Sequence, residues 1–380
     1  MKRWKKIVVV LLLLAVISQL PFAYRRYKLE RLHAAIEQLK SQRIPNPSTG
    51  DFVEYQGVLH VHSFLGGHST GTFEDLIAGA QANNLNFVGM TEHPAKDFDT
   101  AAMTLHGIHG GVLFVNGNEL VTATHDRVLV LPGDERAASA GNLTTEELVA
   151  REKSKGALSL VAYPQDFHSW SAPGYDGVEV YNLFTNSRRI NPVVMFFDAL
   201  WTGSRQELLF VNFYERPSSN LKLWDDAMVS GRRLVATAGN DAHSNVGLSL
   251  NDSSGKKLIG IRLDPYERSF RLVRMHVLLP KEKELTADNL GAALGAGHCY
   301  IAFDLFSDAT GFRFFATSDG EKKIAGDELP LSGDTRLAVS SPLSSRIVLY
   351  KNGEAVQERI AAATEFEVKE KGIYRVEVYL

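Results

Sequence analysis

Short apolar segments that alternate with amphipathic helical stretches restrict the fold of this chain more than any other feature. Residues 58–61 and 85–90 have the length and apolar content of buried strands, and residues 73–80 carry apolar side chains along one face of a helix. This order predicts a β-α-β unit. Later strands are predicted at 112–115, 127–131, 158–162, 177–181 and 234–238. The pattern predicts an α/β fold of the barrel type, in which functional residues lie at the carboxyl ends of the strands.

A change in composition and strand pattern near residue 303 predicts a second folded domain. The chain has 380 residues, which exceeds the usual size of one hydrophobic core. Beyond residue 303, turns rich in glycine and aspartate separate short alternating strands, and Lys351-Asn352-Gly353 is typical of a hairpin turn. We therefore predict a barrel domain over 52–302 and a small all-β, sandwich-like domain over 303–380.

An uncharged run from Ile7 to Tyr24 lies between two basic clusters. As a helix it would be about 27 Å long, close to the hydrocarbon thickness of about 30 Å. We predict a membrane anchor over 1–24 that is retained, followed by a helical stalk and linker over 25–51. A cleaved signal peptide, which would leave a secreted protein, is the alternative. The basic residues that precede the run favour a cytoplasmic N-terminus, so we expect the folded domains on the extracytoplasmic side, periplasmic or extracellular.

Composition excludes several classes of site and partner. Cys299 is the only cysteine, so neither an internal disulfide nor a thiolate zinc cluster can form. The formal net charge is only -3, and no long run of Lys or Arg occurs outside the first 31 residues, so no nucleic-acid partner is expected. Any bound metal must use His, Asp and Glu ligands.

Histidine and carboxylate residues recur at or near the ends of the predicted strands. His60 and His62 close the first strand, and alternate residues of a strand point to the same face, so two imidazoles can bind one ion. A lone His-x-His pair is a weak motif. The series continues in chain order, however, with His68, His93, Glu119, His125, Asp241 and His243. This ordered series predicts a metal centre.

The series resembles the metal-binding motifs of the PHP (polymerase and histidinol phosphatase) superfamily over roughly residues 55–247. The resemblance implies a distorted seven-stranded β/α barrel that binds up to three divalent ions. It implies three ligand sets: His60, His62, Glu119 and Asp241 for the first ion; His68, His93 and His243 for another; and Glu119, as a bridge, with His125 for the remaining one.

One position departs from the family pattern. Where the family usually has His-Pro after an apolar strand, this chain has Tyr163-Pro164. A phenol has a pKa near 10 and is a poor ligand unless a metal lowers that value. We therefore expect the ion bridged by Glu119 to be weakened, absent, or completed by a substitute such as His168 or water. The other two ligand sets are complete.

Ligands of this kind imply hydrolysis. Imidazole and carboxylate suit Zn, Mn or Fe(II), and ions that share a carboxylate activate a water and stabilise charge on an ester oxygen. We predict two to three divalent ions and a metal-dependent hydrolase of ester bonds, with a phosphoester as the favoured small-molecule substrate. Glu119 and Asp241 are the predicted catalytic residues. The candidates for binding an anionic substrate are Arg127, Arg188, Arg189 and Asn182.

Other functions stay open. The segment Gly297-His298-Cys299-Tyr300 and the β-rich tail resemble the carbaryl-hydrolase-like branch, which attacks a carbonyl, so a carboxyl or carbamate ester hydrolase on the same scaffold is an alternative. An amidohydrolase barrel also begins with His-x-His, but Glu119 and the closing Asp241-Ala242-His243 favour the PHP type. The substitution at Tyr163 also leaves open a non-catalytic, membrane-anchored metal-binding protein.

Overall fold

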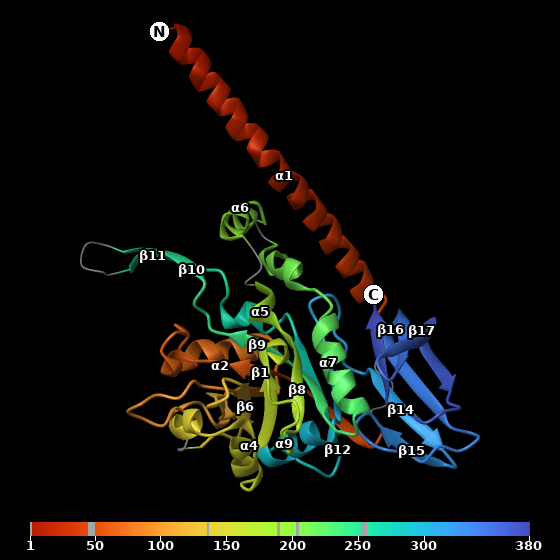
Figure 1. Cartoon of the computed structure of the whole chain (residues 1–380). Coiled ribbons are helices and arrows are strands. Elements are labelled where there is room, and N and C mark those ends of the chain that lie inside the picture. The colour runs from red at the N-terminus through yellow and green to blue at the C-terminus, as the bar shows by residue number, and fades with distance from the viewer. Residues whose placement is uncertain (1, 45–49, 135–136, 188–190, 203–204, 252–256) are drawn as a thin grey trace. The chain divides into compact units, whose positions relative to one another are not determined.

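The computed structural model describes residues 2–44, 50–134, 137–187, 191–202, 205–251 and 257–380 (Figure 1). It divides into two compact units, residues 1–42 with 185–215 and residues 43–184 with 216–380. The boundary that we predict at residue 303 lies inside the second unit, and the domain boundaries stay predictions.

The first unit is built on α1 (Lys2–Ser41), one helix that contains both the predicted anchor and the predicted stalk. This helix is long enough and apolar enough to cross a membrane. A signal sequence near an N-terminus has the same properties. The structure therefore supports an apolar N-terminal helix of either kind and does not assign the side of the membrane.

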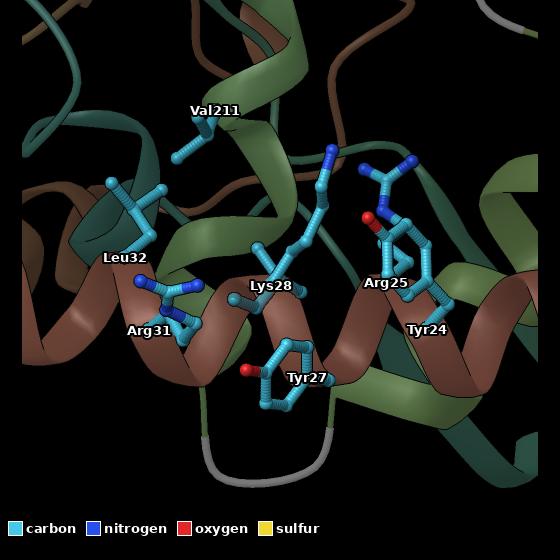
Figure 2. Close-up of a pocket in the computed structure, with 8 residues that line it drawn as sticks. Tyr24, Arg25, Tyr27, Lys28, Arg31, Leu32 and Val211 are labelled. Carbon is cyan, nitrogen blue, oxygen red and sulfur yellow. The ribbon is translucent and has the colours of Figure 1, made fainter.

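Two further helices of the first unit accompany α1. These are α6 (Pro192–Thr202) and the 3-10 helix η4 (Gln206–Phe213). Asp198 of α6 pairs with Arg25 of α1, with 2.6 Å between Oδ2 and Nη1. Val211 of η4 lines a pocket together with several basic and aromatic side chains of α1 (Figure 2).

The second unit contains a large mixed sheet. Its strands are β1 (Phe52–Val61), β2 (Phe87–Met90), β3 (Gly107–His109), β4 (Val112–Val115), β5 (Asn118–Val121), β6 (Arg127–Leu131), β7 (Leu158–Ala162), β8 (Gly177–Asn182), β9 (Val235–Ala242), β12 (Arg274–Pro280) and β13 (Cys299–Ala302). A separate ribbon is made by β10 (Gly247–Asn251) and β11 (Lys257–Arg262). Each predicted strand thus overlaps an observed one, although those predicted at 85–90 and 234–238 begin one or two residues too early, and the α/β class is confirmed.

Helices connect and cover these strands (Figure 1). They are α2 (Phe73–Ala82), α3 (Thr100–Met103), α4 (Thr145–Lys153), α5 (Leu183–Ser187), α7 (Ser218–Val229), α8 (Tyr266–Ser269) and α9 (Ala287–Ala296), with the 3-10 turns η1 (Phe64–Gly66), η2 (Ala137–Asn142) and η3 (Pro164–Asp166). Capping boxes begin α2 and α4, where Thr72 pairs with Asp75 and Thr144 with Glu147. These polar signals explain why both helices begin where they do.

The strand order places the ends of several strands together. The order is β3-β4-β2-β1-β9-β8-β7-β6-β5, and a parallel bridge joins Glu92, just after β2, to Asn118 at the start of β5. This bridge links β5, the last strand of that order, back to the segment that follows β2. The ends of β1, β2 and β9 and the start of β5 therefore meet on one edge, where His62 N–H donates to Ala242 O and Glu119 N–H to Glu92 O.

One strand assignment was wrong. We expected Glu119 to lie at or near the end of a predicted strand, but it is the second residue of β5, after β4 has ended at Val115. β5 pairs antiparallel with β6, and β6 antiparallel with β7, so this part of the sheet is not a β-α-β repeat. The turn between β5 and β6 is too short to hold a crossover helix.

The C-terminal segment forms a single five-stranded sheet rather than two packed sheets, within the part of the chain that is described. Its strands are β14 (Arg313–Ser318), β15 (Glu321–Ile324), β16 (Arg336–Lys351), β17 (Glu354–Glu367) and β18 (Tyr374–Tyr379). The register of β16 shifts between Ser340 and Ser345, and β16 pairs with β14 before this bulge and with β18 after it. The predicted turn at Asn352-Gly353 is confirmed, since Lys351 pairs with Glu354.

Candidate metal centre

The end of β1 supplies two histidines that are completely buried, His60 and His62. Their ring centroids lie 5.1 Å apart. His60 has a φ of 61°, and the register of β1 with both β2 and β9 is irregular around it. The two imidazoles therefore converge through a kink in the strand, and not through the regular alternation of an extended strand that we expected.

Four of the predicted ligands form a buried cluster in which one donor atom of each lies within 4.8 Å of the others: His60, His62, Glu119 and Asp241. Glu119 Oε2 lies 3.1 Å from His60 Nε2 and 3.4 Å from His62 Nε2. Asp241 Oδ1 lies 3.5 Å and 3.4 Å from the same two nitrogens. Two imidazoles and two carboxylates thus surround one small space.

A second cluster, His62, His93 and His243, adjoins the first. The His62 ring stacks on both partners, with centroids 4.7 Å from His93 and 4.3 Å from His243. His68 joins this group, since its Nε2 lies 2.8 Å from His243 Nε2. Glu119 Oε2 is also 3.4 Å from His93 Nε2, so one carboxylate oxygen faces both clusters.

The protonation of His68 and His243 argues for a cation between them. His243 Nδ1 lies 2.8 Å from the carbonyl of Asp241, and His68 Nδ1 lies 3.2 Å from the carbonyl of Gly66. A carbonyl only accepts, so the hydrogen bond places a hydrogen on each Nδ1, and the two Nε2 atoms face each other. Two lone pairs that converge at 2.8 Å repel each other unless a proton or a metal ion lies between them.

Several buried polar atoms of the centre lack a hydrogen-bond partner among the described residues. They include both ring nitrogens of His62 and Asp241 Oδ1. Leaving such an atom unpaired costs about 1–3 kcal/mol, so native structures rarely do so without a reason. A divalent ion would satisfy these donors, and imidazole with carboxylate is the ligand chemistry of Zn, Mn or Fe(II). The residues present therefore fit metal ions.

Burial keeps His62, His93 and His243 in the neutral form that binds metal, whereas the charges of Glu179 and Asp241 outweigh burial at His60 and raise its pKa. Burial lowers the pKa of His62 to about 3 and that of His93 to about 4, and it lowers the pKa of His243 as well. Burial alone would favour a protonated Glu119, but hydrogen bonding and charge from the adjacent His60 hold the pKa of that carboxyl below its usual range. Near neutral pH the centre thus presents neutral His62, His93 and His243 with an ionised Glu119.

Two residues of β8 orient the first cluster. Glu179 Oε1 accepts from His60 Nδ1 at 2.7 Å, which leaves His60 Nε2 facing Glu119. Asn182 Nδ2 donates to Glu179 Oε2 at 3.0 Å and to Asp241 Oδ2 at 3.3 Å. An outer carboxylate that accepts from a ligand histidine is a recurrent feature of metal sites, because it fixes the ring and its tautomer.

Arg127 and Tyr163 lie on the outer side of the two carboxylates. Arg127 Nη1 donates to Glu119 Oε1 at 2.6 Å, and the Tyr163 hydroxyl donates to Asp241 Oδ2 at 2.5 Å. The Arg127 guanidinium lies 5.3 Å from the centroid of the Tyr163 ring. Burial and the neighbouring carboxylates raise the pKa of Tyr163 far above its ordinary value, so its phenol stays protonated.

Other predicted residues do not join the described clusters. His125 lies exposed in the turn between β5 and β6 and belongs to neither cluster. His168 is not the substitute ligand that we considered, because it hydrogen-bonds Asp126 and its side chain is 69% exposed. Arg188 and Arg189 lie outside the described residues.

Sequence reasoning missed two buried glutamates. Glu179 lies in β8, whose six residues are all buried, and Glu92 accepts from the Ser63 N–H and the Thr104 hydroxyl beside the loop that follows β1. A carboxylate inside the otherwise apolar predicted strand 177–181 was the available signal for Glu179, because burial of a charge without a partner is costly.

No family model matches the chain, and no curated protein matches it in sequence. Among solved structures it is similar to a two-domain protein containing a predicted PHP-like metal-dependent phosphoesterase from Bacteroides vulgatus, with 11% identity, 88% of each chain covered and a TM-score of 0.42. It is also similar to PsfC from Pseudomonas syringae, with 15% identity, 66% of this chain and 91% of that chain covered and a TM-score of 0.41. Likenesses of this size do not identify the family of the chain.

Proposed function

We propose that this protein is a metal-dependent hydrolase of ester bonds with a PHP-type barrel, and that its substrate is a phosphoester. The observation that carries the proposal is the position of Glu119 Oε2, which lies within 3.4 Å of nitrogens from His60, His62 and His93. A carboxylate oxygen that faces both clusters is the arrangement that holds two ions close together.

The two clusters would each hold one divalent ion. His60, His62, Glu119 and Asp241 would bind the first, and His68, His93 and His243 would bind the second. Ions in such a centre lower the pKa of a coordinated water and neutralise charge that develops on the ester oxygens.

The chain's own groups favour an anionic substrate. Arg127 uses one N–H on Glu119, while its side chain is 44% exposed, so other N–H groups of the guanidinium can bind an oxyanion. Asp241 is ionised, because the charge of His60 offsets the effect of burial and holds its pKa low. Ionised Asp241 is therefore in the form that binds a cation.

The test is metal content together with a substrate panel, measured on the full-length protein in detergent. We expect two divalent ions per chain, and turnover of an aryl phosphate that exceeds turnover of an aryl carbamate or carboxylate ester. Asp241→Asn should lose at least about 100-fold in kcat/KM, because removal of a ligand should exceed the effect of removing an outer partner. His109→Ala, which changes a histidine outside the clusters, is the matched control and should keep both metal and activity.

The panel separates this proposal from its alternatives. Preference for the carbamate would favour the carbonyl-directed reaction on the same scaffold. Two bound ions with no turnover of any ester would favour a non-catalytic metal-binding protein. Fewer than two ions would contradict the proposed centre.

We further propose that α1 stays attached as a membrane anchor with the folded domains on the extracytoplasmic side. The support is its uncharged run and the basic residues Lys2, Arg3, Lys5 and Lys6 before it. Reporter fusions at the C-terminus test the side, and mass spectrometry of the mature protein tests whether α1 is retained. An active cytoplasmic reporter would contradict the predicted side.

A further inference from the structure

Glu119 and Asp241 each turn only one oxygen toward the histidines. Glu119 Oε2 and Asp241 Oδ1 face His60 and His62, at the distances given above. The other oxygens, Glu119 Oε1 and Asp241 Oδ2, are bound by hydrogen-bond donors of the protein itself. A further ion on the outer side of these carboxylates would have to compete with those donors.

The donors on the outer side cannot act as ligands in their present state. Arg127 has no lone pair to offer and is always charged, and a tyrosine hydroxyl that donates its hydrogen to Asp241 is a poor ligand. His125, the histidine that the resemblance assigns to a third ion, lies exposed and outside both clusters. A third ion of that type therefore does not fit these residues.

The arginine and the tyrosine support each other. Arg127 begins β6 opposite Ala162, the last residue of β7, and Tyr163 follows at once with a φ of 50°. This places the guanidinium against the phenol ring, 5.3 Å from its centroid. The positive charge of Arg127 thus lies against Glu119 Oε1, the oxygen that a further cation would have to use.

We propose that Arg127 and Tyr163 replace the third ion of the centre, so that the site holds two ions and a fixed guanidinium charge. One positive charge on Arg127 then balances part of the charge of Glu119, Asp241 and Glu179 without a ligand set of its own. This inference rests on the proposed metal centre and adds the number of ions that it accepts.

The experiment counts ions by elemental analysis and by calorimetric titration with Zn²⁺ and with Mn²⁺, on the full-length protein in detergent. The wild type should bind two per chain. Arg127→Ala combined with Tyr163→His should bind three, because it frees Glu119 Oε1 and adds an imidazole beside Asp241. Arg127→Lys, which keeps a cation at this position, is the control and should stay at two.

Three ions in the wild type would overturn the replacement. So would a double variant that keeps its fold by circular dichroism and its first two ions but gains no third. Fewer than two ions in the wild type would overturn the metal centre itself, and the proposal with it. If the double variant does not fold, Tyr163→His alone gives the same readout, with a third ion expected at lower affinity and its absence counting against the proposal.

A second, independent observation concerns α6, which packs on α1 where the uncharged run of α1 ends. Phe22 and Phe197 have ring centroids 5.1 Å apart, and Trp201 Nε1 donates to Gln19 Oε1 at 3.1 Å. Asp198, the only charged residue of α6, is buried against Arg25. Side chains on the inner face of α6 thus make ring, hydrogen-bond and ion-pair contacts with α1.

The outer face of α6 is apolar and exposed. Its large side chains include Val193 at 62%, Leu200 at 63% and Phe196 at 42% exposure. Apolar residues of the adjoining part of α1, among them Ile17 and Leu20, are exposed as well. Basic side chains of α1, among them Lys28 and Arg31, follow just beyond the uncharged run and line the neighbouring pocket (Figure 2).

We infer that α6 lies in the lipid interface beside the anchor and forms a second membrane contact. An apolar helix face next to an apolar span, with Trp201 at its end and basic residues beyond, has the composition of an interfacial segment. This inference rests on the retention of α1 as an anchor.

The test uses the full chain in vesicles of phosphatidylcholine and phosphatidylglycerol. Cysteine replaces Phe196 in one variant and Ile360 of the C-terminal sheet in another, both with Cys299→Ala, and each is labelled with an environment-sensitive fluorophore. Ile360 is 77% exposed and serves as the matched control. We expect emission at shorter wavelength and quenching by spin-labelled lipid for position 196 only.

Equal, water-like emission at both positions in vesicles that retain α1 would overturn the membrane contact. Quenching at both positions would also overturn it, since it would show non-specific adsorption. Mass spectrometry of the vesicle sample confirms that α1 is present.

Discussion

Glu179 is the residue that best shows how this centre is held in place. It has 1% exposure and makes its shortest contact with His60 Nδ1, so its charge is balanced inside the fold. Its second oxygen accepts from Asn182, which also reaches Asp241. One outer carboxylate thus sets the orientation of two ligands from different strands.

Replacing Glu179 with Gln should weaken metal binding by roughly 10- to 100-fold, because the amide cannot favour the same tautomer and charge distribution on His60. The measurement is competition with a chromophoric chelator. Glu152→Gln changes another buried glutamate, which pairs with Arg151 and Lys155 away from the clusters, and should leave metal affinity unchanged. Equal affinity in both variants would contradict the role of Glu179.

At the scale of elements, the close approach of β8 and β9 sets the position of Glu179. Gly239 of β9 pairs with Asn182 of β8, and a Cβ at Gly239 would lie 1.7 Å from Glu179 Oε1 and 2.8 Å from His60 Cβ. Only glycine leaves room for the carboxylate between the strand and the histidine.

Gly239→Ala should therefore displace Glu179, lower metal affinity, and destabilise the protein by about 1–3 kcal/mol through overpacking. Gly291→Ala is the matched control, because nothing lies within 4 Å of the added Cβ in α9. That control should be neutral or stabilising by up to about 1 kcal/mol. Chelator competition and denaturant unfolding measure the two effects, and an unchanged metal affinity in Gly239→Ala would contradict the steric argument.

A second buried charge cluster ties β1 and β12 to the segment that leads into the C-terminal sheet. His276 Nδ1 lies 2.8 Å from Glu54 Oε1, and its Nε2 lies 2.9 Å from Asp304 Oδ2. Burial opposes the charged imidazole, but the two carboxylates raise the pKa of His276 to about 9. The charged His276 on β12 thus lies between two carboxylates, one from an earlier residue of the chain and one from a later residue.

This raised pKa predicts a pH dependence of stability. The unfolded histidine has a pKa of about 6.5, so the stabilisation is complete below that pH and is lost as the pH rises through about 9. The resulting loss in the free energy of unfolding is on the order of 3 kcal/mol. Denaturant unfolding between pH 6 and 10 should show this loss in the wild type and a flatter profile in His276→Gln. His106→Gln, at an exposed position, should follow the wild type.

At the scale of the whole molecule, the centre gathers residues from strands that are far apart in the chain. β1, β5 and β9 supply His60, Glu119 and Asp241, and the bridge after β2 brings His93 to the same edge. The unpaired atoms of His62 and Asp241 make the centre costly without ions.

Added Zn²⁺ or Mn²⁺ should therefore raise the thermal unfolding temperature of the chelator-treated protein. The free energy of unfolding should rise by about 2.7 kcal/mol at an ion concentration 100 times Kd, and the rise should increase with ion concentration. Differential scanning calorimetry measures it. His62→Ala should lose most of the response, since His62 faces both clusters, and His106→Ala should keep it. A wild type that shows no shift would contradict metal binding to the folded state.

The sequence by itself determined the class of the fold and the chemistry of the centre. Apolar segments at strand and helix lengths predict the α/β class, because burial depends on local pattern, and the order of His, Glu and Asp residues predicts which donors are present. The apolar N-terminal helix and the turn at Asn352-Gly353 follow from equally local signals.

Only the tertiary structure decided which of those ligand residues come together in each cluster. The kink at His60, the place of Glu119 in an antiparallel hairpin and the exposure of His125 depend on pairing between strands that are distant in sequence. The same is true of Tyr163, which binds Asp241 across 78 residues of chain. Such contacts are set by the closure of the sheet, and local pattern carries no information about them.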